Sequence, residues 1–454
     1  MRLRSYLSSR ASAASYWSGT SKGNNSRSGS KPIKVLHIIN DLSVGGAEIT
    51  LYKLLSEMDE ERFSFAVVSL KNRGKLRERI EALGVPVYTA AMSHAIPTPA
   101  SIWRLIRLVR RLRPDVIQGW MSHGNLISQL TAALAPGRAA VLWNIRQSLY
   151  SLDYEKRITA LAIKLGARIS IKPTGIIYNS RIGAAQHAAI GYSLAKALVI
   201  HNGFDTKVFT PSSVARHSVR SELGVAQNTV LIGLMGRYHG LKDHPNFLRA
   251  AALLREKDSD VQFVLAGREI NWDNHPLREM IQELGLVERV HLLGERQDMP
   301  RITAALDVAV SASFGEGFPN VIGEAMACGV PCVVTDVSDM PWIVGATGRV
   351  VPPRDPAAMS QAFVEMIELG VDGRKELGLA ARARITEHFC LDSVVKQYEA
   401  LYENAATQKD IGKFIKDVWY HRSLEHISAD THRQRDFIKG IAKAGPSRSS
   451  KSKW

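Results

Sequence analysis

From residue 34 onward, short apolar runs rich in β-branched residues alternate with longer amphipathic stretches, and this alternation constrains the fold more than any other feature. In the first half the runs lie at 35–39, 64–70, 86–88, 115–120, 141–144, 175–179 and 197–201. In the second half they lie at 230–235, 262–266, 290–293, 308–311, 332–335 and 348–351. Short strands separated by helices of about ten to fifteen residues predict doubly wound parallel sheets. The fold class is therefore α/β.

A chain of 454 residues is long enough for two such domains. We expect Rossmann-like domains at 33–198 and 199–388 that face each other across a cleft, with a ligand at the carboxyl ends of both sheets. Residues 389–406 are predicted to form a helix that crosses back to the first domain. Residues 1–32 read as a disordered basic leader and 407–454 as a basic tail. A transit peptide, or a start codon assigned too early, would give the leader the same composition.

The net charge of +16 is concentrated at the two ends of the chain. Residues 1–34 contribute +7 and residues 407–454 contribute +6, which leaves +3 for everything between them. The charge alone therefore does not indicate a nucleic-acid-binding body. A nucleic-acid- or anion-binding protein that uses these ends on a catalytically silent scaffold remains an alternative.

Cysteine usage and hydropathy predict the compartment. The three cysteines, Cys328, Cys332 and Cys390, cannot all pair with one another, which favours a reducing environment. The apolar runs fall short of the ~18 residues that a transmembrane helix needs. We therefore expect a cytoplasmic protein.

The segment Glu316 to Thr335, EGFPNVIGEAMACGVPCVVT, carries the strongest chemical signal. Glu316 and Glu324 flank a Gly-Phe-Pro-Asn loop and the start of a short helix that ends at Gly329. Free N–H groups at a helix start attract anions. The two carboxylates can accept hydrogen bonds from sugar hydroxyls. This segment therefore predicts a site for a diphosphate, a ribose and a hexose.

Two further loops follow the first strand of each domain. Gly45 and Gly46 precede a helix, where a backbone without side chains can approach a phosphate, although paired glycines are also common in tight turns. Arg237 and Lys242 follow the strand at 230–235 and can neutralise a departing diphosphate. A solvated basic loop is the alternative for this pair. The spacing is not that of a P-loop.

The sequence predicts a site without metal. Asp258-Ser259-Asp260 has the spacing of a two-aspartate metal site, but it precedes a strand and so lies at the wrong end of the sheet for a ligand. A turn is the better interpretation. No Cys/His cluster has zinc spacing.

His123 and Arg146 follow first-domain strands on the side of the predicted cleft. His123 can contact a sugar hydroxyl or relay a proton, or it can simply cap a helix. Arg146 is a candidate for binding an anionic acceptor.

The stretch 101–113, SIWRLIRLVRRLR, predicts an amphipathic helix with a crowded basic face. Such a face is often only solvated. The functional interpretation is contact with an anionic membrane surface, because each basic residue near such a surface contributes about 1 kcal/mol. The basic residues of 156–168 extend the same sign, so we expect peripheral association with the inner face of the cell membrane.

With these pieces assembled, the chain resembles a family 4 retaining glycosyltransferase of the GT-B fold over about 33–402. The resemblance rests on four elements in the family's order: Gly45-Gly46-Ala47-Glu48, His201-Asn202-Gly203-Phe204-Asp205, Gly236-Arg237 with Lys242-Asp243-His244, and the E-x7-E segment Glu316–Glu324. It implies transfer of a hexose from a UDP- or GDP-sugar to an acceptor hydroxyl with retained configuration. A lipid-linked glycan in polysaccharide biosynthesis is the expected acceptor. No cofactor beyond the nucleotide sugar is implied.

The resemblance also implies roles for the site residues. Arg237 and Lys242 would bind the diphosphate, and Glu324 would hold the ribose. The diphosphate would also contact the backbone of Gly45, Gly46, Asn320 and Val321. The hexose would be held by Glu316 and the backbone of Gly317, Phe318, Pro319 and Asn320. The nucleobase would lie near Leu293, Gly294 and Arg296.

The chain departs from the family's pattern at two places. Gln118-Gly119-Trp120 stands where many relatives have His-x-His, and Val337–Met340 stands where relatives often have Gly-Gly and Glu. His123, three residues after Trp120, is the candidate for the role of the family histidine. Alternatives within the fold are a nucleotide-sugar epimerase and a soluble glucan or sucrose synthase-like transferase. A glycoside hydrolase would also use two carboxylates, but it would not need the neighbouring phosphate-binding groups.

Overall fold

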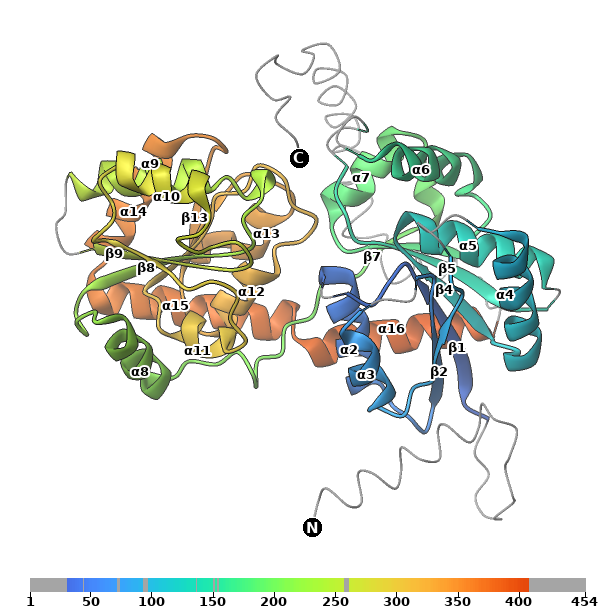
Figure 1. Cartoon of the computed structure of the whole chain (residues 1–454). Coiled ribbons are helices and arrows are strands. Elements are labelled where there is room, and N and C mark those ends of the chain that lie inside the picture. Colours follow the sequence, from blue (N-terminus) through green and yellow to red (C-terminus); the bar gives the residue numbers. More distant parts are fainter. Residues whose placement is uncertain are drawn as a thin grey trace. The chain divides into compact units, whose positions relative to one another are not determined.

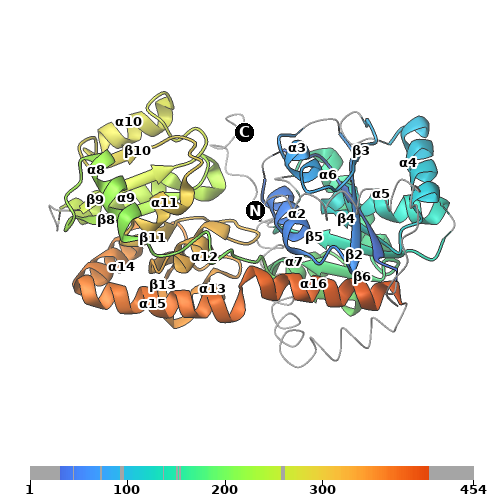
Figure 2. The ribbon, with the colours of Figure 1, turned by 90° about the horizontal axis from the view of Figure 1, so that it is seen from below.

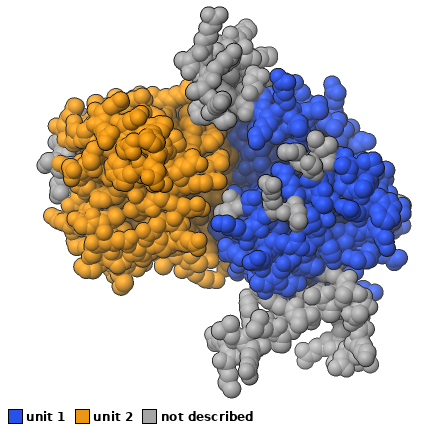
Figure 3. Space-filling model, in the orientation of Figure 1, with its two compact units in different colours: residues 1–201, 395–454 blue, residues 202–394 orange. Residues whose placement is uncertain are grey.

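The computed structural model describes residues 31–43, 45–71, 74–92, 97–135, 137–149, 152, 155–256 and 261–407. The chain divides into two compact units, one of residues 1–201 with 395–454 and one of residues 202–394 (Figure 3). Residues 1–30 of the basic leader, the basic tail beyond 407 and Asp258-Ser259-Asp260 lie outside the described residues.

Within the described part of unit 1, a seven-stranded parallel sheet has the order β3-β2-β1-β4-β5-β6-β7 (Figure 1). Its strands are β1 (Ile33–Ile39), β2 (Phe63–Ser69), β3 (Val87–Thr89), β4 (Val116–Trp120), β5 (Ala140–Ile145), β6 (Gly175–Tyr178) and β7 (Ala197–Val199). The order reverses between β1 and β4. Loops after these two strands leave in opposite directions, and this opens a crevice at the carboxyl end of the sheet.

Helices cover both faces of this sheet. They are α2 (Gly46–Glu57), α3 (Leu76–Glu81), α4 (Pro99–Leu112), α5 (Met121–Leu134), α6 (Arg157–Ile169), α7 (Arg181–Ala189) and the 3-10 turn η3 (Leu194–Lys196). Helix α4 begins where Thr98 and Ser101 form a capping box. Its residues Leu105, Val109 and Leu112 are buried in one cluster with β-strand side chains such as Ile38. The apolar stripe of the basic helix thus packs on the sheet as the sequence pattern predicts.

The last helix, α16 (Leu391–Ala406), belongs to unit 1 from Val395 onward (Figure 2). The Tyr402 hydroxyl donates to the Gln118 side chain at 2.8 Å, and the Asn144 amide donates to the Tyr398 hydroxyl at 3.0 Å. All four side chains are buried. These bonds pair the side-chain oxygen of Gln118 and the side-chain nitrogen of Asn144, which β4 and β5 would otherwise bury without partners.

Unit 2 contains, in its described residues, a six-stranded parallel sheet of order β10-β9-β8-β11-β12-β13. The strands are β8 (Val230–Met235), β9 (Val261–Ala266), β10 (Val290–Leu292), β11 (Val308–Ser311), β12 (Cys332–Thr335) and β13 (Gly348–Val351). The order reverses between β8 and β11, so the same topological argument places the crevice of this unit after those two strands.

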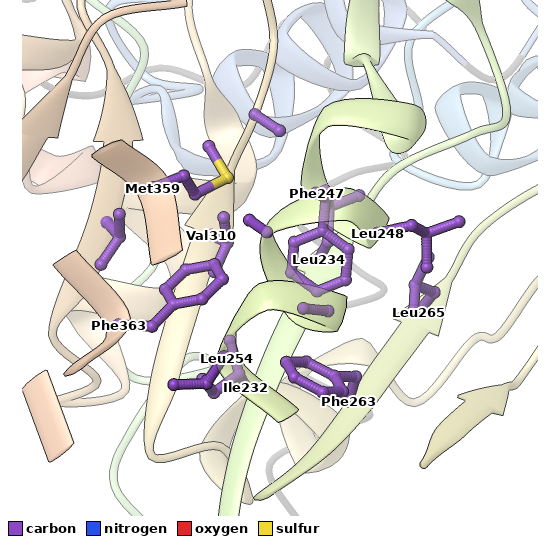
Figure 4. Packing of buried hydrophobic residues seen from close by; sticks show 14 of the residues in the cluster. Ile232, Leu234, Phe247, Leu248, Leu254, Phe263, Leu265, Val310, Met359 and Phe363 are labelled. Atoms are coloured by element: carbon purple, nitrogen blue, oxygen red, sulfur yellow. The ribbon is translucent and has the colours of Figure 1, made fainter. Parts of the chain in front are cut away.

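The helices of unit 2 enclose an aromatic core. They are α8 (Ser213–Leu223), α9 (His244–Arg255), α10 (His275–Glu283), α11 (Met299–Ala304), α12 (Asn320–Ala327), α13 (Met340–Val344), α14 (Pro356–Glu368) and α15 (Gly370–His388), with 3-10 turns η4 (Gly240–Lys242) and η5 (Gly345–Thr347). Phe247 of α9 meets Phe263 of β9 and Phe363 of α14 edge to face (Figure 4). This core fixes α9, and with it the loop between β8 and α9.

The two ends of unit 2 pair with each other. The Phe204 amide donates to the Phe389 carbonyl at 2.9 Å, and the Leu391 amide donates to the Phe204 carbonyl at 3.0 Å. The first and the last segment of unit 2 are therefore joined by a short parallel bridge between Phe204 and Cys390.

A search of the described residues for a helix long and apolar enough to span a bilayer finds none.

Candidate active site

In unit 2 the loops that follow β8 and β11 are joined directly to each other. The Phe314 amide, beyond β11, donates to the Leu241 carbonyl, beyond β8, at 3.0 Å. The Lys242 side chain passes over Gly236, where a Cβ atom would lie 3.5 Å from its Cε. The topological crevice of this unit therefore holds the basic loop and the Glu316 loop as one structure.

Lys242 and Glu316 form an ion pair, Nζ to Oε1. The Ser313 hydroxyl donates to the same Oε1 at 2.8 Å, and Ser313 is almost completely buried. The Lys242 and Glu316 side chains are 21% and 11% exposed. The two residues that we assigned to different parts of the donor are thus in contact with each other. Ser313 was missed, although a serine directly after a strand and three residues before Glu316 was a usable signal.

Arg237 lies on the same loop as Lys242 and is exposed. The pKa of the neighbouring His239 is lowered by burial and by the charges of Arg237 and Lys242, with Glu316 acting in the opposite direction. The loop therefore presents positive charge at the carboxyl end of β8, as a diphosphate site requires.

Buried rings hold the loop between Glu316 and α12. Phe318 stacks on Phe204 with ring centroids 6.1 Å apart and lies 6.2 Å from the ring of Phe389. The Ser338 hydroxyl donates to the Gly317 carbonyl at 2.9 Å. Phe318 and Pro319 are buried, so only their backbone and the shape of their loop are available to the predicted donor site.

Helix α12 begins at Asn320, as the sequence predicts, and ends before Gly329, whose φ is +71°. The Asn202 amide donates to the Asn320 side-chain oxygen, which ties the helix start to the His201-Asn202-Gly203 segment. Glu324 is the fifth residue of α12 and half-buried, so it lies just beyond the first turn of the helix. Val321 is in that first turn, whose N–H groups are suited to a phosphate.

Three adjacent strands, β8, β9 and β10, are each followed by a glycine at the same edge: Gly236, Gly267 and Gly294. Their φ angles are 157°, 152° and 65°, a region that favours glycine. A Cβ on Gly267 would lie 2.2 Å from the Gly236 carbonyl oxygen, and the Gly267 amide donates to the Gly294 carbonyl at 2.8 Å. We call these three residues the glycine ledge.

The glycine ledge includes Gly294 of the predicted nucleobase region, and Leu293 directly precedes it. Gly267 was missed because a single glycine after a strand carries no motif. Arg296 has other partners: its guanidinium binds Asp298 at 2.8 and 2.9 Å and Glu222 at 2.9 Å. Arg296 and Arg301, by hydrogen bonding to the Asp298 carboxylate, lower its pKa. In this region the glycine ledge, which has no side chains, is a better candidate than Arg296 for contact with a nucleobase.

In unit 1, α2 begins at Gly46 with Gly45 as its N-cap. The carboxyl group of Glu48 folds back over Gly45, where a Cβ would lie 2.5 Å from its Oε2. Burial and, to a smaller extent, the nearby Asp41 raise the pKa of Glu48 to about 7. At pH values below about 7 this carboxyl group is mostly protonated, so it repels an anion less than an ionised carboxylate does.

His123 is the third residue of α5, which starts directly after β4, so it is not in a strand-end loop. Its Nε2 is buried and has no hydrogen-bond partner among the described residues. Burial and the charge of Lys71 lower its pKa, which keeps the ring neutral. Lys71, which follows β2 and lies 3.7 Å from the Asp41 carboxylate, is a further charged group at this edge that the sequence analysis missed.

We expected Arg146 to lie open at the side of the predicted cleft, but its side chain is buried. Its guanidinium donates to the Tyr398 hydroxyl at 3.2 Å and to the Asn144 side chain at 3.3 Å. It also lies 5.7 Å from the ring centre of Trp120. The sequence could not show this, because Tyr398 comes from α16, 252 residues later.

Two family models match the chain. The model described as glycosyl transferases group 1 matches residues 229–368, and the model described as glycosyltransferase family 4 matches residues 44–208. The chain belongs to the group 1, family 4 glycosyltransferases.

Relatives of this glycosyltransferase are distant in sequence. EpsF of Bacillus subtilis, named as a glycosyltransferase, is 26% identical over 320 residues, which are 67% of this chain and 79% of EpsF. N-acetyl-alpha-D-glucosaminyl L-malate synthase of Bacillus anthracis is 24% identical over 53% of this chain and 63% of its own length. D-inositol 3-phosphate glycosyltransferase of Mycolicibacterium vanbaalenii is 32% identical over 38% of this chain and 41% of its own length.

Solved structures establish the shared fold. HepE of Anabaena in complex with UDP has a TM-score of 0.72 at 22% identity, covering 82% of this chain and all of HepE. Its complex with UDP-glucose has a TM-score of 0.69 at 23% identity and the same coverage. The prediction of two Rossmann-like domains of the GT-B type is confirmed.

In this glycosyltransferase, the positions that replace His-x-His are part of the interior of unit 1. The Gln118 side chain accepts a hydrogen bond from the Tyr402 hydroxyl, and the Trp120 indole donates one to the His37 ring at 3.1 Å. His123 is therefore the histidine of this segment that keeps an unpaired ring nitrogen. Within the described ranges, no group of three or more His, Cys, Asp or Glu side chains is arranged to hold a metal ion. Metal independence stays a prediction.

Proposed function

We propose that this glycosyltransferase moves a hexose from a UDP- or GDP-sugar to an acceptor hydroxyl with retained anomeric configuration and without a metal. The observation that carries the proposal is that a backbone hydrogen bond and an ion pair connect the Lys242 loop to the Glu316 loop. This contact lies where the strand order of unit 2 reverses, between β8 and β11. It puts a cation for a diphosphate beside a carboxylate for sugar hydroxyls. HepE, which has the same fold, has been solved with UDP and with UDP-glucose.

The chemistry follows from these groups. The bond between the anomeric carbon and the diphosphate breaks, and a bond from the acceptor oxygen to that carbon forms on the same face. A donor phosphate oxygen takes the acceptor proton. Arg237 and Lys242 stabilise the charge that develops on the leaving diphosphate. Glu316 and Glu324 bind hydroxyls of the hexose and the ribose and do not act as acids. His123 supplies a neutral ring nitrogen on the acceptor side.

For the acceptor we propose a lipid-linked glycan of polysaccharide biosynthesis at an anionic membrane surface, on the inner face of the cell membrane. Helices α4, α5 and α6 pack side by side and contain no Asp or Glu. Their exposed apolar side chains include Trp103, 59% exposed, and Leu161, 67% exposed. Basic residues surround them, a combination typical of helices that lie on anionic lipid.

A panel of UDP- and GDP-sugars tests the donor by thermal shift. A cognate donor at 100 times its Kd stabilises the folded state by about 2.7 kcal/mol. NMR of the product then gives its anomeric configuration, and turnover with and without EDTA tests the metal. An inverted product or loss of turnover in EDTA would contradict the mechanism, and a donor epimerised without any acceptor would favour an epimerase.

A further inference from the structure

Lys242 and Glu316 neutralise each other in this structure. The Ser313 hydroxyl donates a hydrogen bond to the Glu316 carboxylate, and the backbone hydrogen bond from Phe314 to Leu241 fixes the spacing of the two loops. The pair is mostly shielded from water, with side-chain exposures of 21% and 11%. Neither charge can be left alone without cost, because a shielded ion that loses its partner is strongly disfavoured.

A nucleotide diphosphate that recruits Lys242 therefore takes the cation away from Glu316. It also brings negative phosphate oxygens towards a carboxylate that Ser313 keeps in place. In an intact nucleotide sugar, hexose hydroxyls can donate hydrogen bonds to this carboxylate and replace the lost ammonium. The spent nucleotide offers no such donors.

We propose that the Lys242–Glu316 pair, positioned by Ser313, makes the donor site discriminate between a nucleotide sugar and the nucleotide that remains after transfer. Glu316 is the specificity-determining residue, and Ser313 is a positioning residue that acts through it. The consequence is faster release of the spent nucleotide. This inference rests on the proposed nucleotide-sugar donor, and it adds a function for the contact between the two charges.

The test compares the affinities of UDP and UDP-glucose, and of GDP and GDP-mannose, for the full chain and for Glu316→Gln by calorimetry. Removing the carboxylate frees Lys242 and removes the repulsion, so the nucleotide diphosphate should bind about 10-fold more tightly. The nucleotide sugar should gain much less, because it loses charged hydrogen bonds to its hydroxyls. The ratio of the two Kd values should therefore fall.

Ser313→Ala provides a second variant, in which Glu316 keeps its charge but loses its support. We expect the same fall in the ratio at smaller size, together with weaker product inhibition by UDP or GDP. Glu365→Gln is the matched control, because it removes a carboxylate from an ion pair with Arg349 on the same unit. That variant should leave both affinities unchanged.

The outcomes separate the two proposals. If the native chain binds none of the four nucleotides, the nucleotide-sugar function is wrong and this inference falls with it. If the native chain binds them but both variants change the two affinities by the same factor, only the inference is wrong. Weaker binding of UDP or GDP by Glu316→Gln would also overturn it.

Discussion

At the residue scale, the charge that develops in the reaction has to be met by groups already in place. Lys242 is held by its stem over Gly236 and by Glu316, so its ammonium is fixed near the carboxyl end of β8. Preorganised charges of this kind stabilise a transition state without reorganisation during the reaction.

Lys242→Ala should therefore lower kcat by about 10²- to 10³-fold with a nucleotide-sugar donor. The measurement is steady-state turnover at saturating donor. Lys207→Ala is the control, because Lys207 is 82% exposed and lies 4.0 Å from Asp392. Unchanged turnover in Lys242→Ala would end the assignment of this residue to the leaving group.

Glu48 gives a prediction about pH. Its pKa in the folded state is raised by burial to about 7, above the ordinary value of 4.5, so the folded state binds its proton more tightly than the unfolded state. The contribution of protonated Glu48 to the free energy of unfolding is fully present below pH 4.5. It decreases as the pH rises to about 7. Relative to Glu48→Gln, the native chain should lose about 1–3 kcal/mol of unfolding free energy over that interval.

Denaturant unfolding at several pH values between 4.5 and 7.5 measures this difference. Glu81→Gln, which removes a surface carboxylate paired with Arg77, is the control and should follow the native chain. Parallel curves for the native chain and Glu48→Gln would show that the Glu48 pKa is not raised.

Single residues also show where sequence reasoning succeeds. Arg237, Lys242 and Glu316 were predictable because a loop after a strand of a parallel sheet must lie at the carboxyl edge. Gly267 carries no motif, and its importance comes from Gly236 and Gly294 at the ends of neighbouring strands. Ser313 was a usable signal that was missed, and it acts through Glu316, three residues later on the same loop. The burial of Arg146 depends on α16, and no local pattern contains that contact.

At the element scale, the strands were predicted almost completely because buried parallel strands are continuous apolar runs. Helices were less predictable. Helix α15, Gly370–His388, was missed because it contains Gly370, Gly373 and Gly378, which normally disfavour a helix. The structure gives the reason for one of them: a Cβ on Gly378 would lie 1.9 Å from the Gly329 carbonyl oxygen. Helix α15 thus packs directly against the end of α12.

Gly378→Ala should therefore destabilise the protein by about 1–3 kcal/mol, since the added methyl group overpacks this contact. Gly373→Ala is the matched control: it lies on the same helix, and its new Cβ would meet only the Leu369 side chain, at 3.1 Å. Thermal unfolding of both variants decides the point. Equal melting temperatures would mean that α15 does not need close approach at Gly378.

At the scale of the whole molecule, the strand order reverses once in each of the two sheets, between β1 and β4 and between β8 and β11. Because a ligand site forms at the carboxyl ends of the strands at such a reversal, candidate residues follow strand ends in both units. The sequence predicts both domains because each repeats the same alternation. It does not predict that three helices without Asp or Glu lie next to one another in unit 1. That property emerges only when α4, α5 and α6, separated along the chain by strands, are seen packed side by side (Figure 1).

The basic residues of α4 yield the last prediction. Arg104, Arg107 and Arg111 of α4 are exposed, and the Arg107 guanidinium lies 5.4 Å from the ring centre of Trp103. Each basic residue contributes about 1 kcal/mol near an anionic surface, so replacing all three with Gln should weaken binding to phosphatidylglycerol-containing vesicles about 100-fold. Activity on a lipid-linked acceptor should fall in parallel, and donor binding by thermal shift should stay unchanged.

The control replaces Lys207, Arg249 and Lys375, which are exposed basic residues of unit 2, and removes the same net charge from the chain. Screening by salt should weaken vesicle binding of the native chain and of this control to the same extent. If the control loses vesicle binding as fully as the α4 variant, net charge and not this face drives the association. If neither loses it, the basic face of α4 is only solvated, and the acceptor must reach the enzyme without help from an anionic surface.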